Sequence, residues 1–359
     1  MRIFLTFIVI CLWSCNKETS IVPRYFSSVE IEPMVMDSTI SVRAITFNDE
    51  YLFFGSSGHL GKKALAKENK FDLNKFKWTS DNITVKTLLT YNDEPLQFRA
   101  IAEVDGVLFG ISIGNPARLY KINRKSQNPV LVYEEQHEKV FYDSMDFWND
   151  LEGIAIGDSI DGCLSIIITR DGGKTWNKLS CNDLPKGNQG EGAFAASDTN
   201  IAIVGDKTWV ATTSGRIYYS ADKGMTWEVF ETPIVHEKET EGIYSIDFYD
   251  ELNGYGIGGD YTDPEANAAN KILTKDGGKT WELVAQNKEP GYRSCVQYIP
   301  NREGKELVAV GFKGIDYSSD GGYTWKHLSD EGYYTIRFIN ENEAYAAGKG
   351  RISKLHFEE

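Results

Sequence analysis

The sequence of 359 residues has few of the features that would identify a chemistry. Its five histidines stand at positions 59, 137, 236, 327 and 356, without the close spacing that metal ligands have. It has no Gly-x-Ser-x-Gly elbow and no dinucleotide fingerprint, and glycine-rich segments such as residues 55–58 lead into strand-like sequence rather than into a phosphate-binding helix. We therefore predict no metal and no cofactor, and the sequence gives no support to an oxidoreductase.

Positive charge is also scarce. The chain has 38 lysines and arginines against 52 aspartates and glutamates, a formal net charge of −14. Proteins that bind nucleic acid need basic patches to neutralise phosphates, and no Lys/Arg cluster offsets the negative excess here. We predict that nucleic acid is not a partner and interpret the charge as a contribution to solubility.

The N-terminus carries a hydrophobic run that is too short for a membrane span. Arg2 precedes apolar residues from Ile3 to Trp13, whereas about 20 residues are needed to cross a bilayer. The following Leu12-Trp-Ser-Cys15 resembles a bacterial lipobox. We predict a signal peptide over residues 1–14, a lipidated Cys15 with a polar tether over residues 15–27, and a folded domain over residues 28–359. A simple cleaved signal is the alternative.

Five cysteines are present, and three remain after the predicted export, at Cys163, Cys181 and Cys295. The first two flank a predicted hairpin, in which positions 163 and 182 would face each other. A disulfide in an oxidising compartment and a pair of buried thiols are both compatible with that spacing. Cys295 lies in a predicted inner strand and is expected in the core.

One short sequence motif occurs four times, at residues 169–176, 220–227, 274–281 and 318–325. All four copies fit S/T-x-D-x-G-x-T-W, and strand-like sequence flanks each of them. A repeat of this length that ends in a tight turn is typical of one small sheet per repeat, arranged radially. The Asp and Trp positions shared by the four copies are Asp171, Trp176, Asp222, Trp227, Asp276, Trp281, Asp320 and Trp325.

The residue types of this motif suit a turn between two strands. Glycine after the Asp supplies the positive φ of a tight turn, and the carboxylate can accept hydrogen bonds from the backbone of its own loop. The Trp is large enough to wedge against a neighbouring sheet. A recurring carboxylate could also suggest calcium or catalysis, but a structural turn must recur in every repeat and an active site need not. We therefore interpret these residues as structural.

These residues resemble the Asp-box (BNR) repeat found in sialidases, sortilin-type receptors and Ycf48-type assembly factors. Residues 146–158 and 247–260 are also similar to the F-x-D-x-x-x-G-x-x-x-G element of Ycf48-like proteins. The resemblance implies a β-propeller and, for the Ycf48-like group, partner binding through an arginine-rich surface. We expect an exported bacterial lipoprotein of this kind in the cell envelope, at the outer membrane on its periplasmic or surface side.

The inner strands predict an all-β, seven-bladed propeller of four-stranded antiparallel blades. Similar strand starts recur at residues 41–47, 98–102, 142–147, 192–196, 244–248, 293–298 and 334–338. The first two blades have degenerate boxes: Thr79-Ser-Asp81 keeps the front half, and residues 123–128 keep nothing. The last repeat is too short for four strands, so we predict that an N-terminal strand around residues 28–32 closes the ring and removes its open edges.

Binding groups are expected at the face opposite the box turns, where loops enter the inner strands and leave the second strands. Residues 262–270 form a large insertion on this face, and we expect the segment over residues 207–215 to expose Trp209 there. The predicted ligand-binding residues are Arg43, Arg99, Arg293, Asp158, Tyr261 and Trp209. We predict a monomeric binding or assembly module for a protein, anionic or carbohydrate ligand, without catalysis.

The alternative is a glycosidase of sialidase type. In that family three arginines hold a carboxylate, and a Tyr–Glu pair and an Asp carry the chemistry. The corresponding candidates are Arg43, Arg99 and Arg293 with Tyr244 or Tyr334, Glu191 and Asp260. Against this, the Arg-Ile-Pro element of sialidases is replaced by Arg43-Ala-Ile45, and sialidase propellers have six blades rather than seven.

Overall fold

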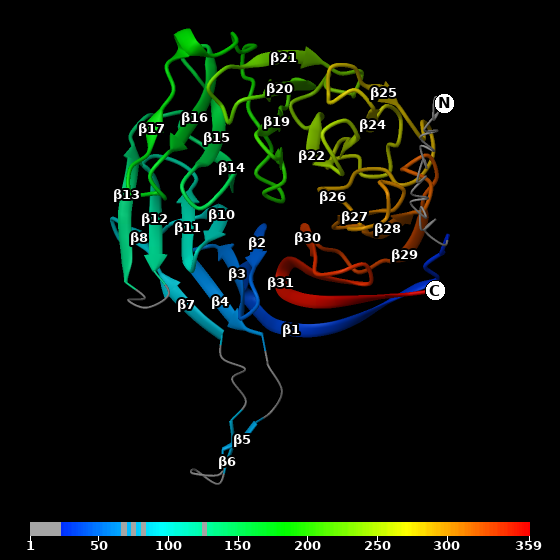
Figure 1. Cartoon of the computed structure of the whole chain (residues 1–359), viewed down its shortest axis with the longest axis horizontal. Coiled ribbons are helices and arrows are strands. Elements are labelled where there is room, and N and C mark those ends of the chain that lie inside the picture. Colours follow the sequence, from blue (N-terminus) through cyan, green and yellow to red (C-terminus); the bar gives the residue numbers. More distant parts are fainter. Residues whose placement is uncertain (1–22, 66–69, 73–76, 80–83, 124–127) are drawn as a thin grey trace, which may run out of the picture.

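Short apolar strands separated by Gly, Asn and Asp turns form a ring of sheets around a central axis (Figure 1). The computed structural model describes residues 23–65, 70–72, 77–79, 84–123 and 128–359. Within these residues, seven sheets make up the ring, and neighbouring strands in each sheet pair antiparallel. The predicted seven-bladed all-β propeller is therefore confirmed.

Blades 1 to 6 each contain four strands in chain order. In blades 1 to 3 the strands are β2 (Ala44–Phe47), β3 (Tyr51–Ser56), β4 (His59–Ala64) and β7 (Thr84–Leu88); β10 (Phe98–Val104), β11 (Val107–Ser112), β12 (Ala117–Asn123) and β13 (Pro129–Glu135); β14 (Tyr142–Phe147), β15 (Gly153–Ile160), β16 (Cys163–Thr169) and β17 (Asn177–Lys178). In blades 4 to 6 they are β18 (Ile201–Val204), β19 (Lys207–Ala211), β20 (Arg216–Ser220) and β21 (Glu228–Glu231); β22 (Ile243–Phe248), β23 (Gly254–Gly258), β24 (Lys271–Thr274) and β25 (Glu282–Leu283); β26 (Cys295–Tyr298), β27 (Leu307–Gly311), β28 (Gly314–Ser318) and β29 (Lys326–Ser329).

The seventh blade joins the two ends of the chain. It contains β30 (Thr335–Phe338), β31 (Glu343–Glu358) and β1 (Ser28–Ser41). β31 folds back on itself, because the Phe357 N–H donates to the Asn342 carbonyl at 2.8 Å and Lys354 forms a salt bridge with Glu343 at 2.6 Å. Its first half pairs with β30 and its second half with β1, which gives four strands (Figure 1). The predicted closure by an N-terminal strand is thus confirmed.

The folded part begins before residue 28. Arg24 is 9% exposed and forms a salt bridge with Glu306 at 2.9 Å, and Phe26 is 1% exposed within the core of the last two blades. The predicted tether, residues 15–27, therefore overlaps the propeller at these positions. Cys15 and the predicted signal peptide lie outside the described residues. Among the described residues, no helix has the length and apolar character to cross a bilayer, and the helix found there is the 3₁₀ turn η1 (Cys181–Asp183).

Six of the seven predicted inner-strand starts coincide with strands, and one is wrong. Residues 192–196 are irregular, and the inner strand of blade 4 begins later, at Ile201. Two short hairpins also add to the predicted pattern. One pairs β5 (Lys70–Asp72) with β6 (Lys77–Thr79) and projects from blade 1, and the other pairs β8 (Thr90–Tyr91) with β9 (Glu94–Pro95) between blades 1 and 2 (Figure 1).

The box turns have the predicted construction. In the first box, one Asp171 oxygen accepts from the backbone N–H groups of Lys174 and Thr175 at 2.9 Å, and the other accepts from the Thr175 hydroxyl at 2.7 Å. Although partial burial opposes it, these bonds lower the pKa of Asp171 to about 2. Asp222 and Asp276 accept the same three kinds of bond, and Asp320 accepts from the N–H and hydroxyl of Thr324.

Each box packs against the preceding blade. Trp176 lies 6.2 Å from the Phe109 ring of blade 2, and Trp325 lies 5.9 Å from the Tyr255 ring of blade 5, both edge-on. Trp281 belongs to the same apolar cluster as Trp209 of blade 4, and Trp227 to the same cluster as Trp148 of blade 3. The box Trp is thus a wedge between blades, as the sequence predicted.

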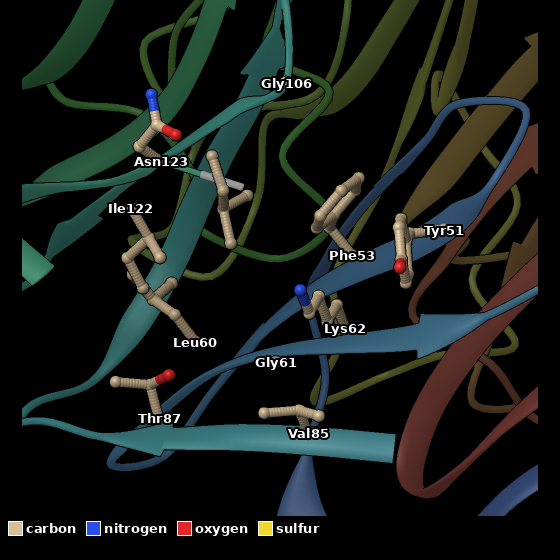
Figure 2. A pocket seen from close by; sticks show the side chains of 11 residues that line it. Tyr51, Phe53, Leu60, Gly61, Lys62, Val85, Thr87, Gly106, Ile122 and Asn123 are labelled. Atoms are coloured by element: carbon tan, nitrogen blue, oxygen red, sulfur yellow. The ribbon is translucent and has the colours of Figure 1, made fainter. Parts of the chain in front are cut away.

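Blade 2 lacks this wedge. The pairing of Ile122 with Pro129 corresponds to that of Ile168 with Asn177 in blade 3, so the exposed Asn128 stands where the box Trp would be. An apolar groove of about 30 Å³ lies at this junction, and Figure 2 shows side chains of blades 1 and 2 that line it, among them Phe53. In blade 1 the connection from β4 to β7 is long and carries the β5–β6 hairpin, and Asp81 lies outside the described residues.

The cysteines resolve the alternatives left by the sequence. Cys163 and Cys181 form a disulfide, with their Cα atoms 5.5 Å apart. The bond joins the start of β16 to the connection that leads from blade 3 to blade 4. Cys295 is a free thiol and is fully buried in the core, as predicted.

Candidate functional site

A pocket of about 430 Å³ opens on the face opposite the box turns. It lies where chain segments enter the inner strands and leave the second strands, which is where the sequence predicted a site. Two guanidinium groups line it, those of Arg43 and Arg99. Six aromatic rings also line it: Phe194, Tyr244, Tyr261, Tyr292, Phe312 and Tyr334. We call this cavity the mouth pocket.

The floor of the mouth pocket is a segment that crosses the axis of the ring. Residues 193–200, which we call the plug segment, contact each of the other six blades through hydrogen bonds. The Asp198 carboxylate accepts from the backbone N–H groups of Ile101 in blade 2 and Met145 in blade 3, both at 3.0 Å. The further partners are Arg43 before blade 1, Ser245 of blade 5, Ser294 before blade 6, and Thr335 and Arg337 of blade 7.

A second cavity lies on the other side of the plug segment. It has a volume of about 250 Å³ and is lined by Asp146, Asp198, Asp247 and Arg337, among others. Burial raises the pKa of Asp146 to about 6 and the pKa values of Asp198 and Asp247 to about 7, although Arg337 opposes this in each case. Ala196 lines the mouth pocket and Asp198 lines this chamber, so the plug segment divides the channel into an arginine-bearing end and an acidic end.

Two of the three predicted arginines meet at the mouth pocket. The Arg43 guanidinium lies 4.2 Å from the centre of the Tyr334 ring, and it donates to the Ala196 carbonyl at 3.5 Å. The half-buried Arg99 has no hydrogen bond or salt bridge to any described residue. Its pKa is lowered by burial and by the neighbouring charge of Arg43, although Asp143 opposes this.

Arg293 does not belong to this pair. It is 4% exposed, and its Nε donates to the Asp316 carboxylate at 2.5 Å while a second nitrogen donates to the Tyr292 carbonyl at 2.8 Å. An arginine that is already held by a buried acid cannot form the third arm of a carboxylate clamp without breaking that ion pair. The structure therefore brings together Arg43 and Arg99 but not the predicted cluster of three.

The predicted Tyr–Glu pair is not assembled either. Glu191 is 1% exposed and is bound by Arg216, by the Tyr218 hydroxyl at 3.1 Å and by the Thr212 hydroxyl at 2.7 Å. Tyr244 instead donates to the Thr240 carbonyl at 2.8 Å, and burial raises the pKa of its hydroxyl. Tyr334 lies under Arg43. Among the described residues, neither tyrosine hydroxyl has a hydrogen bond to a carboxylate that could act as the base for a nucleophile.

The predicted carboxylates differ in exposure and partners. Asp260 is 3% exposed and bound by Lys238 and Thr262, and although burial opposes it, these bonds lower its pKa. Asp158 accepts from the Ala193 N–H at 3.2 Å, and burial raises its pKa to about 6. Tyr261 is 48% exposed at the rim of the mouth pocket. We found no group of three or more His, Cys, Asp or Glu side chains suited to a metal ion in the part of the chain that the structure describes.

Trp209 is not on the mouth face. It lies in β19, is fully buried, and stacks on the Phe248 ring with their centres 3.8 Å apart. Its indole N–H donates to the Gly277 carbonyl at 2.8 Å. Because β18 begins later than predicted, the segment 207–215 supplies the second strand of blade 4, and Trp209 takes the place that Phe109 has in blade 2.

Sequence reasoning missed several residues of the mouth pocket. Phe194 stacks on Tyr244 at 3.7 Å, and Tyr292 meets Tyr244 edge-on at 4.7 Å, so the three rings form one wall. Phe312 is 42% exposed and extends this wall to the surface. Phe194 lies in the segment that was expected to be a strand. The position of Tyr292, just before a predicted inner strand, was the one available signal.

Comparison with known proteins agrees with the repeat and the fold. The family model for the BNR/Asp-box repeat matches residues 167–178. A search of curated proteins finds no match. Similar solved structures include YCF48 bound to a D1 peptide (13% identity, 93% of this chain and 98% of that chain covered, TM-score 0.63) and the WD40 repeats of RRP9 (9%, 94% and 99%, 0.60). The computationally designed protein Ika8 is also similar (11%, 91% and 99%, 0.53).

At these identities the likeness to solved structures concerns the fold alone. The repeat match falls on the first of the four boxes, which is the turn whose hydrogen bonds are described above. Together these findings identify the chain as a seven-bladed BNR/Asp-box β-propeller.

Proposed function

We propose that this propeller is a protein-binding module whose ligand is an acidic segment of a partner protein, held in the mouth pocket. The proposal rests on one observation: Arg99 lines a pocket, is half-buried and has no salt bridge to a described residue. Asp143 favours the charged form of this guanidinium, but no hydrogen bond joins the two side chains. Part of the desolvation cost of Arg99 therefore remains, and an incoming carboxylate would offset it.

The walls of the mouth pocket suit a peptide. The aromatic rings offer apolar area at a low cost in side-chain entropy, and Tyr261 and Phe312 carry this surface out to the rim. Arg43 is already oriented by the Tyr334 ring, so little conformational freedom is lost when it binds a carboxylate. The similar structure of YCF48 with a D1 peptide supports peptide binding by this fold.

The sialidase-type alternative receives no support from this geometry, because Arg293 and Glu191 are each engaged by a buried partner of opposite charge. We also propose that the module acts at the bacterial cell envelope, anchored through Cys15. The N-terminal sequence supports this, and the Cys163–Cys181 disulfide is typical of an oxidising compartment.

An array of acidic peptides, paired with an array in which Asn and Gln replace Asp and Glu, tests the binding proposal. The purified protein should bind acidic peptides and ignore their neutral counterparts. Arg99→Gln should weaken binding about tenfold, the loss of one charge-assisted hydrogen bond. Arg170→Gln is the matched control, because Arg170 lies in a box turn on the opposite face and is paired with Glu152.

Two results would contradict the proposal. Equal binding to both arrays would show that the arginines do not select carboxylates. An equal loss in Arg170→Gln would show that binding occurs elsewhere. Uronic-acid oligosaccharides, tested in parallel, would place the ligand among carbohydrates if they bind through Arg99 and the peptides do not.

A further inference from the structure

The buried Asp143 and the half-buried Asp158 are neighbouring carboxylates, and Asp143 also interacts with Arg99. Asp143 lies in β14 and is fully buried, and neither of its carboxylate oxygens has a partner within hydrogen-bonding geometry among the described residues, although the nearby Ala193 N–H favours its ionised form. Asp158 in β15 accepts from the Ala193 N–H at the start of the plug segment. A buried carboxylate without a donor is costly when ionised, so this position requires an explanation beyond folding.

The neighbouring charged and titratable groups come from β10 and from the segments before β2 and β30. Asp143 interacts electrostatically with Asp158 of β15 and with Arg99 of β10. Arg99 in turn interacts with Arg43, which precedes β2, and with Tyr334, which precedes β30. The two carboxylates therefore repel each other, while Arg99 is the cation that favours the ionised form of Asp143. Arg43, Arg99 and Tyr334 line the mouth pocket, and Asp143 interacts with Arg99.

We propose that Asp143 and Asp158 form a proton-binding pair that sets the anion affinity of the mouth pocket. This inference rests on the proposed binding of a carboxylate by Arg99. When the pair is ionised, its charge neutralises Arg99 and opposes an incoming anion. When a solvent proton binds to a carboxylate oxygen of the pair, Arg99 is released to the ligand. Anion binding is thus coupled to proton uptake, and by linkage each favours the other.

The titration behaviour of the two groups agrees with this role. Burial and the charge of Asp158 raise the pKa of Asp143 well above its usual value, although Arg99 opposes this. Burial raises the pKa of Asp158 to about 6. An anion bound at Arg99 adds negative charge and raises both further, so the ligand should bind more tightly as pH falls through neutrality.

Calorimetry with benzoate as the probe and benzamide as its uncharged control tests the coupling. Benzoate should bind about tenfold more tightly near pH 5.5 than near pH 8, and the measured heat should depend on the buffer, as proton uptake requires. The double variant Asp143→Asn/Asp158→Asn should bind benzoate equally at both values. Asp260→Asn is the control, since that carboxylate is paired with Lys238 and should leave the pH dependence unchanged.

The outcomes separate this inference from the proposed function. Benzoate binding that depends on Arg99 but not on pH would overturn the proton coupling and leave the binding proposal intact. A side-chain NMR titration decides the coupling without any ligand: Asp143 should titrate well above its usual pKa, and higher still in Arg99→Gln. Titration of Asp143 near 4, or no response to Arg99→Gln, would overturn the inference even if benzoate binds.

Discussion

The glycine two residues after the Asp of each box meets two requirements, a turn with positive φ and close packing against the preceding blade. In the fourth box, Gly321 and Gly322 have φ values of +78° and +87°, a region that other residues enter at a cost. They differ in surroundings. A Cβ on Gly322 would overlap the ring of Tyr255 in the preceding blade, whereas the nearest atom to a Cβ on Gly321 is the Gly304 carbonyl oxygen, 3.9 Å away. The turn favours glycine at both positions, although Lys223 takes the first one in the second box, and blade packing adds a separate requirement at the second.

This difference predicts unequal effects of the same substitution. Gly321→Ala should lower the free energy of unfolding by about 1–2 kcal/mol, the cost of a left-handed backbone. Gly322→Ala should cost about 1–3 kcal/mol more, because the added methyl group must displace a fully buried ring. Urea unfolding of the two variants measures the difference. Equal losses would show that the turn alone determines these positions.

Individual residues could be assigned from the sequence where their interactions lie within a few residues of them along the chain. Within a box, the Asp carboxylate accepts hydrogen bonds from the Thr a few residues later, and the glycine between them supplies the positive φ. The sequence pattern alone therefore predicts the turn. The predicted exposure of Trp209 is wrong because its partner Phe248 lies in the next blade, and nothing in the local sequence indicates that contact. The predicted place of Arg293 in the arginine cluster is wrong for the same reason, because its salt-bridge partner Asp316 is 23 residues away in the sequence and the fold brings the two together.

At the level of elements, the plug segment is the main departure from the predicted structure. Gly-Ala-Phe-Ala-Ala at residues 192–196 has the small and aromatic residues of an inner strand, so the sequence predicted one. The segment instead crosses the axis because its hydrogen bonds are met by six other blades rather than by one strand. A local sequence pattern cannot indicate hydrogen-bond partners that are distributed over six other blades. The segment both closes the channel and forms the pocket floor.

The Asp198 carboxylate helps to hold the plug segment across the axis, because each of its oxygens accepts a hydrogen bond from a buried backbone N–H. Asp198→Asn offers one oxygen in place of two, so either Ile101 or Met145 loses its acceptor. We expect a loss of about 1–3 kcal/mol in the free energy of unfolding, together with weaker ligand binding at the mouth pocket. Asp206→Asn is the control, because its carboxylate is 69% exposed. Unchanged stability and affinity in Asp198→Asn would contradict this role of the plug segment.

On the scale of the whole molecule, the ring is closed by strands from both ends of the chain. The number of blades and this closure could be predicted because boxes and inner strands recur at regular spacing and the last repeat was visibly short. β1 pairs with β31 from Ser28 opposite Glu358 to Ser41 opposite Lys349 (Figure 1). Arg24 and Phe26 extend the contact into the core. Without β1, the second half of β31 would be an open edge.

Closure should therefore control the folding of the entire ring. A chain that starts at Pro23 keeps every contact described here and should unfold in one cooperative transition. A chain that starts at Val42 lacks β1, exposes the edge of β31 and leaves Glu306 without Arg24; we expect it to lose that transition and to aggregate. Calorimetry and light scattering distinguish the two. A synthetic peptide covering residues 24–41 should restore soluble, cooperatively folded protein by pairing with the open edge. If the shorter chain melts like the longer one, blade 7 is stable with three strands, and the ring does not depend on its N-terminal strand.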